Sequence, residues 1–179
     1  MNTSEINNLD YYMNTQHKLG FAVLLTGAWG VGKTHFINAY FKDRPDVKYI
    51  YISTYGLSKT LDIDDLIFQE LNPILGSKTT KLVGKILKGM LSATLKIDLN
   101  HSEGNVTLKI PEVKLPENWN PDNHVFVFDD IERTSIQTKG LFGYINHFVE
   151  HFDCKVIMLA DEKKIEENFA DYKKYKEKV

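Results

Sequence analysis

The chain has 179 residues, enough for one domain with a substantial core, and its 42% hydrophobic and 26% charged residues are typical of a globular protein. A formal net charge of −2 excludes the strongly basic surface of a general nucleic-acid-binding domain and leaves only a local nucleic-acid contact open. A single cysteine excludes an internal disulfide and a CxxC zinc site and predicts a reducing, cytoplasmic environment, while no apolar run approaches the ~18 residues that span a bilayer.

The first part of the chain alternates helical and extended patterns. The order is helix, strand, helix, strand and helix, predicted over residues 5–19, 21–25, 34–41 and 47–53 and from residue 58 to an end near Asn72-Pro73. The run FAVLL at 21–25 is apolar throughout, which predicts a strand buried on both faces of a parallel sheet. The residues predicted to face inward in the last of these helices are Leu61, Leu66, Ile67 and Leu71.

The middle of the chain, about 76–122, interrupts this alternation. An amphipathic helix is predicted over 78–96, and a β-hairpin is predicted from LKIDLN and VTLKIP, closed at Gly104-Asn105. Prolines make the exit from this segment irregular. We interpret the segment as a helix-plus-hairpin insertion into a single domain that covers residues 1–179.

The last part of the chain returns to alternating patterns. The predicted order is strand, helix, strand and charged helix, over residues 124–129, 136–152, 155–160 and 162–178. Strands that alternate with helices indicate an α/β fold with a parallel sheet and right-handed crossovers.

A glycine-rich sequence, GAWGVGKT at 27–34, fits the pattern GxxxxGK[ST] and lies between a predicted strand and a predicted helix. Glycines let successive backbone N–H groups point at phosphate oxygens, and the helix that begins near Lys33 adds the positive end of its dipole. Lys33 is predicted to reach the β- and γ-phosphates, and the Thr34 hydroxyl to ligate Mg²⁺. The residues predicted to contact a nucleotide are Gly27, Ala28, Trp29, Gly30, Val31, Gly32, Lys33, Thr34 and His35.

Two carboxylates follow the apolar strand in the sequence VFVFDDIER. Asp129 is predicted to hold Mg²⁺ through water, opposite the Thr34 hydroxyl. Asp130 occupies the place of a carboxylate that polarises the attacking water, and Glu132 is the rival base. Because aspartate is shorter than the glutamate often found there, we expect hydrolysis to be slow or to depend on a partner. The alternative is that the paired aspartates only cap the exit of the strand.

Two residues within these motifs each have a functional and a structural interpretation. Trp29 either packs the loop against the core, which we favour, or touches the nucleotide. Arg133 either contacts phosphate as a finger or sensor, or pairs with a nearby acid on the surface.

The two motifs together resemble those of the KAP group of P-loop NTPases, which read G-x-W-G-x-G-K-[ST] and hhhhDD-x-[DE]-R. The residues that fall on these positions include Trp29, Gly30, Asp129, Asp130, Glu132 and Arg133. The resemblance covers roughly residues 21–165. It implies an ATPase core of the additional-strand type and often a role in bacterial defence against phage or plasmids. Many members carry transmembrane helices between the motifs, but the insertion here is too polar for a membrane function to carry over.

The sequence therefore predicts a three-layer P-loop NTPase with a mostly parallel sheet. A complete core of this type has a fifth strand and a lid, so we expect an incomplete C-terminal part and read the chain as the N-terminal portion of a longer protein. The predicted function is Mg²⁺-dependent ATP binding with slow or partner-stimulated hydrolysis, which drives a conformational or assembly switch with a protein partner or a second copy. A non-hydrolysing signalling switch of the STAND type and a small-molecule phosphotransferase remain open as alternatives.

Overall fold

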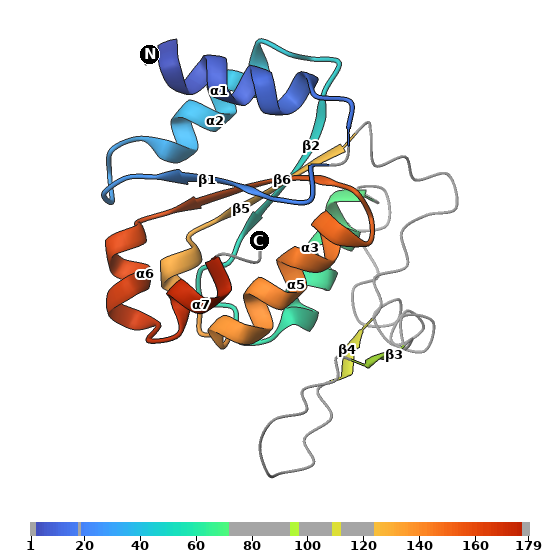
Figure 1. Cartoon of the computed structure of the whole chain (residues 1–179), viewed down its shortest axis with the longest axis vertical. Helices are drawn as coiled ribbons and strands as arrows, with labels where there is room; N and C mark the ends of the chain where they lie inside the picture. The colour runs from blue at the N-terminus through green and yellow to red at the C-terminus, as the bar shows by residue number, and fades with distance from the viewer. Residues whose placement is uncertain (1–2, 18, 72–93, 97–108, 112–123, 177–179) are drawn as a thin grey trace.

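A parallel sheet forms the centre of the computed structural model, which describes residues 3–17, 19–71, 94–96, 109–111 and 124–176 (Figure 1). Its four strands lie in the order β1-β6-β5-β2 and pair in parallel throughout. They are β1 (Val23–Thr26), β2 (Lys48–Ser53), β5 (His124–Asp129) and β6 (Lys155–Ala160). The predicted α/β fold with a parallel sheet is confirmed, and the bounds of β5 and β6 are those that the apolar runs predict.

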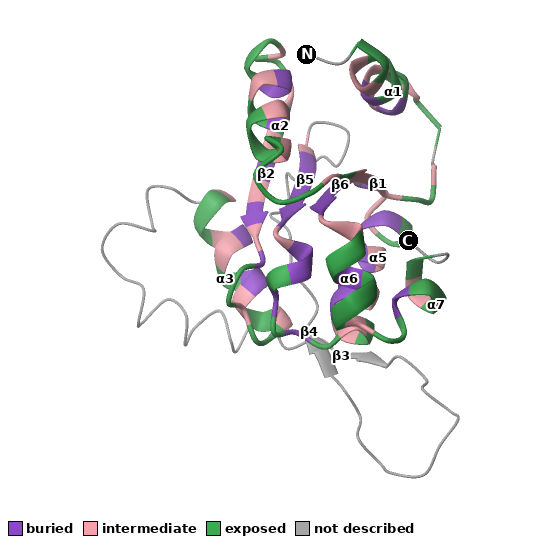
Figure 2. Ribbon diagram, turned by 90° about the vertical axis from the view of Figure 1, so that its left-hand side faces the viewer, coloured by how far each residue is buried: buried purple, intermediate pink, exposed green. Residues whose placement is uncertain are grey.

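Helices cover both faces of this sheet (Figures 1 and 2). One face carries α1 (Thr3–Asn14) and α2 (Lys33–Lys42). The opposite face carries α3 (Thr60–Leu71), α5 (Thr138–Glu150), α6 (Glu162–Asn168) and α7 (Tyr172–Lys176). The predicted three-layer arrangement is therefore confirmed.

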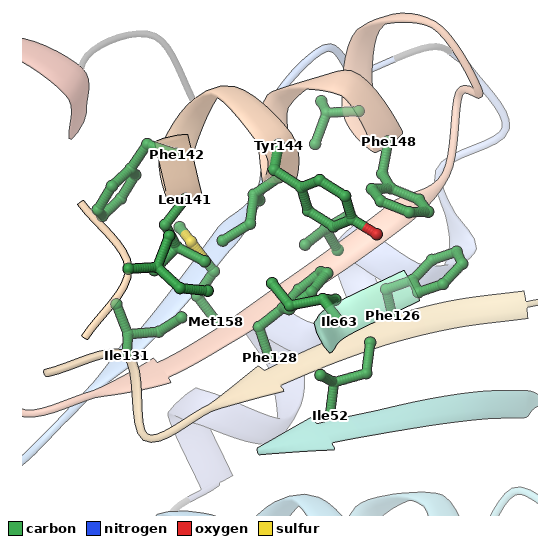
Figure 3. Packing of buried hydrophobic residues seen from close by; sticks show 14 of the residues in the cluster. Ile52, Ile63, Phe126, Phe128, Ile131, Leu141, Phe142, Tyr144, Phe148 and Met158 are labelled. Carbon is green, nitrogen blue, oxygen red and sulfur yellow. The ribbon is translucent and has the colours of Figure 1, made fainter. Parts of the chain in front are cut away.

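The central strand β5 divides its side chains between the two cores. Val125 and Val127 belong to the cluster under α1 and α2, whereas Phe126 and Phe128 belong to the cluster under α3 and α5. Figure 3 shows Phe126 and Phe128 on the side of the sheet that faces α5. The ring centres of Phe126 and Phe148 lie 4.4 Å apart. Because successive side chains of a strand point to opposite faces, an apolar run of this kind is buried on both sides.

The strand β1 differs from its prediction. It pairs with β6 on one side and has no strand neighbour on the other within the described residues. Its first three residues are half-buried, and Phe21, just before it, is 46% exposed. The prediction that 21–25 is buried on both faces is wrong, because an apolar run does not reveal whether the strand takes a central or an edge position.

Several predicted helix bounds are also wrong. The first helix spans Thr3–Asn14 and not 5–19. The charged helix predicted over 162–178 divides into α6 and α7, because Phe169 adopts an extended backbone and packs against the core.

The face that α3 turns to the core is only partly as predicted. Ile67 is buried, and Leu66 and Leu71 pack against the core at intermediate exposure. Leu61, however, is 39% exposed, while Ile63 is completely buried. The stripe that faces the core therefore begins at Ile63, which lies four positions before Ile67 on the same helical face.

The predicted hairpin is present in part. Strand β3 (Thr94–Lys96) pairs antiparallel with β4 (Lys109–Pro111), and Leu95 lies opposite Ile110. The helix predicted over 78–96 is wrong at its last residues, which belong to β3, and the rest of that helix and the predicted turn at Gly104-Asn105 lie outside the described residues. None of the helices in the described part of the chain has the length and apolar character needed to cross a membrane.

A buried carboxyl group links α3 to α5. The Tyr144 hydroxyl donates to Asp64 Oδ1 at 2.5 Å, and Asp64 Oδ2 has no hydrogen-bond partner within the described residues. Burial, with a smaller contribution from the nearby Asp65, raises the pKa of Asp64 to about 7, although the bond from Tyr144 acts in the opposite direction.

This raised pKa predicts that the domain loses stability as the pH rises. The folded carboxyl keeps its proton up to about pH 7, whereas the unfolded one releases it near its ordinary value of 3.8, so the free energy of unfolding should fall across this window. Asp64→Asn is expected to flatten the change, measured by urea unfolding from about pH 4 to about pH 8. Asp46→Asn, at an exposed carboxyl on the connection between α2 and β2, is the control, because Asp46 does not contribute to the raised pKa of Asp64. An unaltered slope in Asp64→Asn would contradict the prediction.

Candidate functional site

The glycine-rich loop connects β1 to α2 at the carboxyl edge of the sheet. Gly30 and Gly32 have φ angles of +79° and +95°. Residues other than glycine adopt this backbone region only with strain. Gly32 is the N-cap of α2, and the N–H of Gly27 donates to the carbonyl of Ala160 at 3.1 Å. The shape of the loop is therefore set by its glycines and by its attachment to β6.

The Lys33 side chain folds back across this loop. Its ammonium Nζ donates to the carbonyl of Gly27 at 2.7 Å and to that of Ala28 at 3.3 Å. Two neutral carbonyl groups thus hold the positive charge at the loop. A bond from an ammonium to an anion is stronger than one to a neutral carbonyl, so an anion at the loop could draw Nζ away from both.

The acidic end of β5 meets the start of α2. Val125 and Val127 face α2, and the same alternation places Asp129 on that side of the sheet. The Thr34 hydroxyl donates to Asp129 Oδ2 at 2.5 Å, across 95 positions of the chain. Asp129 is only 3% exposed. The loop and the end of the strand therefore come together, as the sequence motifs predict.

Two further donors reach the Asp129 carboxylate. The Tyr51 hydroxyl donates to Oδ2 at 2.6 Å, and the backbone N–H of Asp130 donates to Oδ1 at 2.7 Å. Burial and the bond to Asp129 raise the pKa of Tyr51 above its ordinary value, so the hydroxyl stays protonated. Sequence reasoning missed Tyr51. The sequence predicts that Tyr51 lies in a strand, but it does not reveal the order of the strands, which places β2 next to β5.

Asp130 lies at the rim of the site in a strained conformation. Its φ of +58° is in the left-handed region, which aspartate tolerates better than most residues. Its Oδ2 accepts from the Ser53 hydroxyl at 2.8 Å, and its Oδ1 accepts from Arg133 at 3.4 Å. The Arg133 guanidinium also lies 3.9 Å from the centre of the Tyr55 ring. The pairing of Arg133 with a nearby acid, one of its two predicted roles, is thus present in this structure.

Glu132 has a different environment. Its side chain is buried, and Oε2 has no hydrogen-bond partner among the described residues. Its backbone carbonyl accepts from the Asn168 side chain of α6 at 3.3 Å. Glu132 therefore belongs to the contact between α6 and the 3-10 helix η2 (Ile131–Arg133), whereas solvent reaches Asp130.

The remaining loop side chains point toward solvent. Trp29 is 76% exposed, Val31 is 67% exposed, and His35 is exposed in the first turn of α2. The favoured prediction that Trp29 packs against the core is wrong, because the loop lies beyond both hydrophobic clusters. Contact of Trp29, Val31 and His35 with a nucleotide stays a prediction.

Comparison with known proteins agrees with this arrangement. A sequence model of the KAP family P-loop domain matches residues 2–179, a span that includes both the loop and the end of β5. No curated protein matches the chain. Because the match covers almost the whole length, the chain belongs to the KAP family of P-loop NTPase domains, a family of nucleotide-binding domains.

Proposed function

We propose that this domain binds ATP with Mg²⁺ and hydrolyses it slowly, so that the nucleotide state controls a conformational or assembly change. The observation that supports this most directly is the hydrogen bond between Thr34 and Asp129 beside the glycine-rich loop. A hydroxyl and a carboxylate are the hard oxygen donors that Mg²⁺ prefers, so the residues present fit the ion. Bound Mg²⁺ would neutralise negative charge on the phosphate oxygens.

The start of α2 is suited to hold phosphate. Gly32 is its N-cap and makes no side-chain cap bond, so the first backbone N–H groups of α2 are not satisfied by a cap. These N–H groups and the Lys33 ammonium favour negative charge at the same place. We expect Lys33 Nζ to exchange the carbonyls of Gly27 and Ala28 for phosphate oxygens when nucleotide binds.

Asp130 is the better candidate for the residue that orients the attacking water. It lies next to Asp129, remains partly open to solvent and has the unusual backbone conformation that often occurs at functional sites. Glu132 is buried against α6, which disfavours its role as the rival base. In this structure Asp130 forms an ion pair with Arg133. Turnover would therefore be slow while the pair is intact, and it would rise when a protein partner draws Arg133 away.

Single-turnover hydrolysis tests this assignment. Asp130→Asn is expected to slow hydrolysis by about 10²- to 10⁴-fold while ATP affinity stays close to that of the wild type. Glu132→Gln is the matched comparison and should hydrolyse at a rate similar to the wild type. The opposite ranking would assign the base to Glu132. Binding without turnover in the wild-type chain, even with Mg²⁺, would favour the non-hydrolysing signalling switch.

On the family resemblance we also propose a cytoplasmic role in defence against phage, through a protein partner or a second copy of the chain. The test is phage plating on bacteria that express the protein. Protection is expected from the wild type and not from Lys33→Ala. Equal plating on both strains would argue against this role without affecting the nucleotide chemistry.

A further inference from the structure

A tyrosine outside both sequence motifs shares the central carboxylate oxygen of the site. The Tyr51 hydroxyl and the Thr34 hydroxyl both donate to Asp129 Oδ2, at 2.6 and 2.5 Å. The contact joins β2 to β5 across 78 positions of the chain. Nothing in the phosphate-binding chemistry of the loop requires an aromatic residue at this place, so Tyr51 needs its own explanation.

The sheet explains how this tyrosine reaches the site. In the register of β2 with β5, Tyr51 lies opposite Val127 and Ser53 lies opposite Asp129. Tyr51 packs with the cluster under α1 and α2, on the face to which Asp129 also points. Its side chain is long enough to place the hydroxyl beside a carboxylate that belongs to the opposed pair two positions further along the ladder.

The three donors leave the carboxylate little freedom to rotate. Oδ2 accepts from Thr34 and Tyr51, and Oδ1 accepts from the N–H of Asp130. An ionised carboxylate offers about four acceptor positions, so most of them are occupied. The donors come from α2, from β2 and from the turn after β5, which means that three separate segments define one orientation.

We propose that Tyr51 is a positioning residue for the Mg²⁺ site, whose hydroxyl holds the Asp129 carboxylate toward Thr34 before nucleotide arrives. The inference rests on the proposed function of this site. A ligand whose orientation is set in advance loses less conformational freedom when the ion binds. The Thr34 oxygen can ligate the ion while its O–H group still donates to Asp129 Oδ2, and the Tyr51 hydroxyl donates to that same Oδ2 atom.

The same strand supplies a matched control. Tyr49 lies two residues before Tyr51 and packs in the same cluster, but its hydroxyl donates to Asn38 of α2 at 3.3 Å in an exposed bond. Its ring stacks on Phe41 with centres 4.4 Å apart, a contact that phenylalanine would keep. Tyr49→Phe therefore makes the same chemical change on the same face without touching Asp129.

The test is calorimetric binding of a non-hydrolysable ATP analogue to the full chain, once with Mg²⁺ and once with EDTA. Tyr51→Phe is expected to reduce the gain in affinity that Mg²⁺ provides by about tenfold, the effect of losing one bond to a charged group. Its affinity in EDTA should equal that of the wild type. Tyr49→Phe should match the wild type in both conditions. In an Asp129→Asn background, Tyr51→Phe should have no further effect on the Mg²⁺ gain.

The outcomes separate this inference from the proposed function. A wild-type chain whose affinity does not respond to Mg²⁺ would overturn both. A wild type that responds, together with a Tyr51→Phe variant that responds equally, would overturn only the role of Tyr51. An equal loss of affinity with Mg²⁺ and with EDTA, or a Tyr51→Phe chain that does not fold, would also overturn it, since either result would make the hydroxyl a structural group.

Discussion

Lys33→Ala is expected to weaken the binding of an ATP analogue by about one to two orders of magnitude, measured by calorimetry. The substitution removes the only lysine of the loop sequence GAWGVGKT, the charge that would exchange two carbonyl groups for phosphate oxygens. The exposed Lys42, in the last turn of the same helix, is the control, and Lys42→Ala should bind as the wild type does. An unchanged affinity in Lys33→Ala would contradict the phosphate role.

Stability must be measured alongside this loss. Lys33 also bridges the carbonyls of Gly27 and Ala28, so alanine removes contacts within the loop as well as a charge. Those contacts are partly exposed, and we expect the free energy of unfolding to change by about 1 kcal/mol or less. A small change in stability beside a large change in affinity would assign the effect to the binding site.

Phe126→Ala is expected to lower the free energy of unfolding by about 3 to 5 kcal/mol. Phe126 has no exposed surface, and it packs against Phe148 between β5 and α5, with the two ring centres 4.4 Å apart (Figure 3). Removing the ring leaves a cavity in the centre of the larger core. Urea unfolding followed by circular dichroism measures the change.

Tyr11→Ala provides the comparison for this core substitution. Tyr11 is 74% exposed on α1, so its loss should change the free energy of unfolding by no more than about 0.5 kcal/mol. Similar effects of the two substitutions would mean that the core between β5 and α5 is not packed as described.

The position of the site follows from the parallel sheet. The glycine-rich loop follows β1, the Asp129–Asp130 pair ends β5, and Ser53 ends β2. The carboxyl ends of parallel strands lie at one edge, which is where open α/β sheets bind their ligands. Tyr51 and Ser53 come from the strand beside β5 and add hydroxyl groups to the two aspartates. The site is thus assembled from three strand ends.

Features that depend on neighbours along the chain could be predicted from the sequence alone. The apolar runs of β5 and β6 predict the bounds of both strands, since burial on two faces demands such runs. The glycine spacing predicts a loop with positive φ angles followed by a helix, because only glycine adopts that backbone freely. The charged pattern over 162–178 predicts a single helix, whereas the structure has two, α6 and α7.

By itself, the sequence determined the α/β alternation, the glycine-rich loop and the paired aspartates, since each depends on local backbone freedom or on short-range periodicity. Only the tertiary structure decided that β1 takes an edge position, that Glu132 is buried, that Trp29 is exposed and that Tyr51 reaches Asp129. The physical reason is the strand order β1-β6-β5-β2, which brings together residues far apart in the chain. Burial and hydrogen-bond partners depend on that pairing, which is a property of the whole sheet and of no single segment.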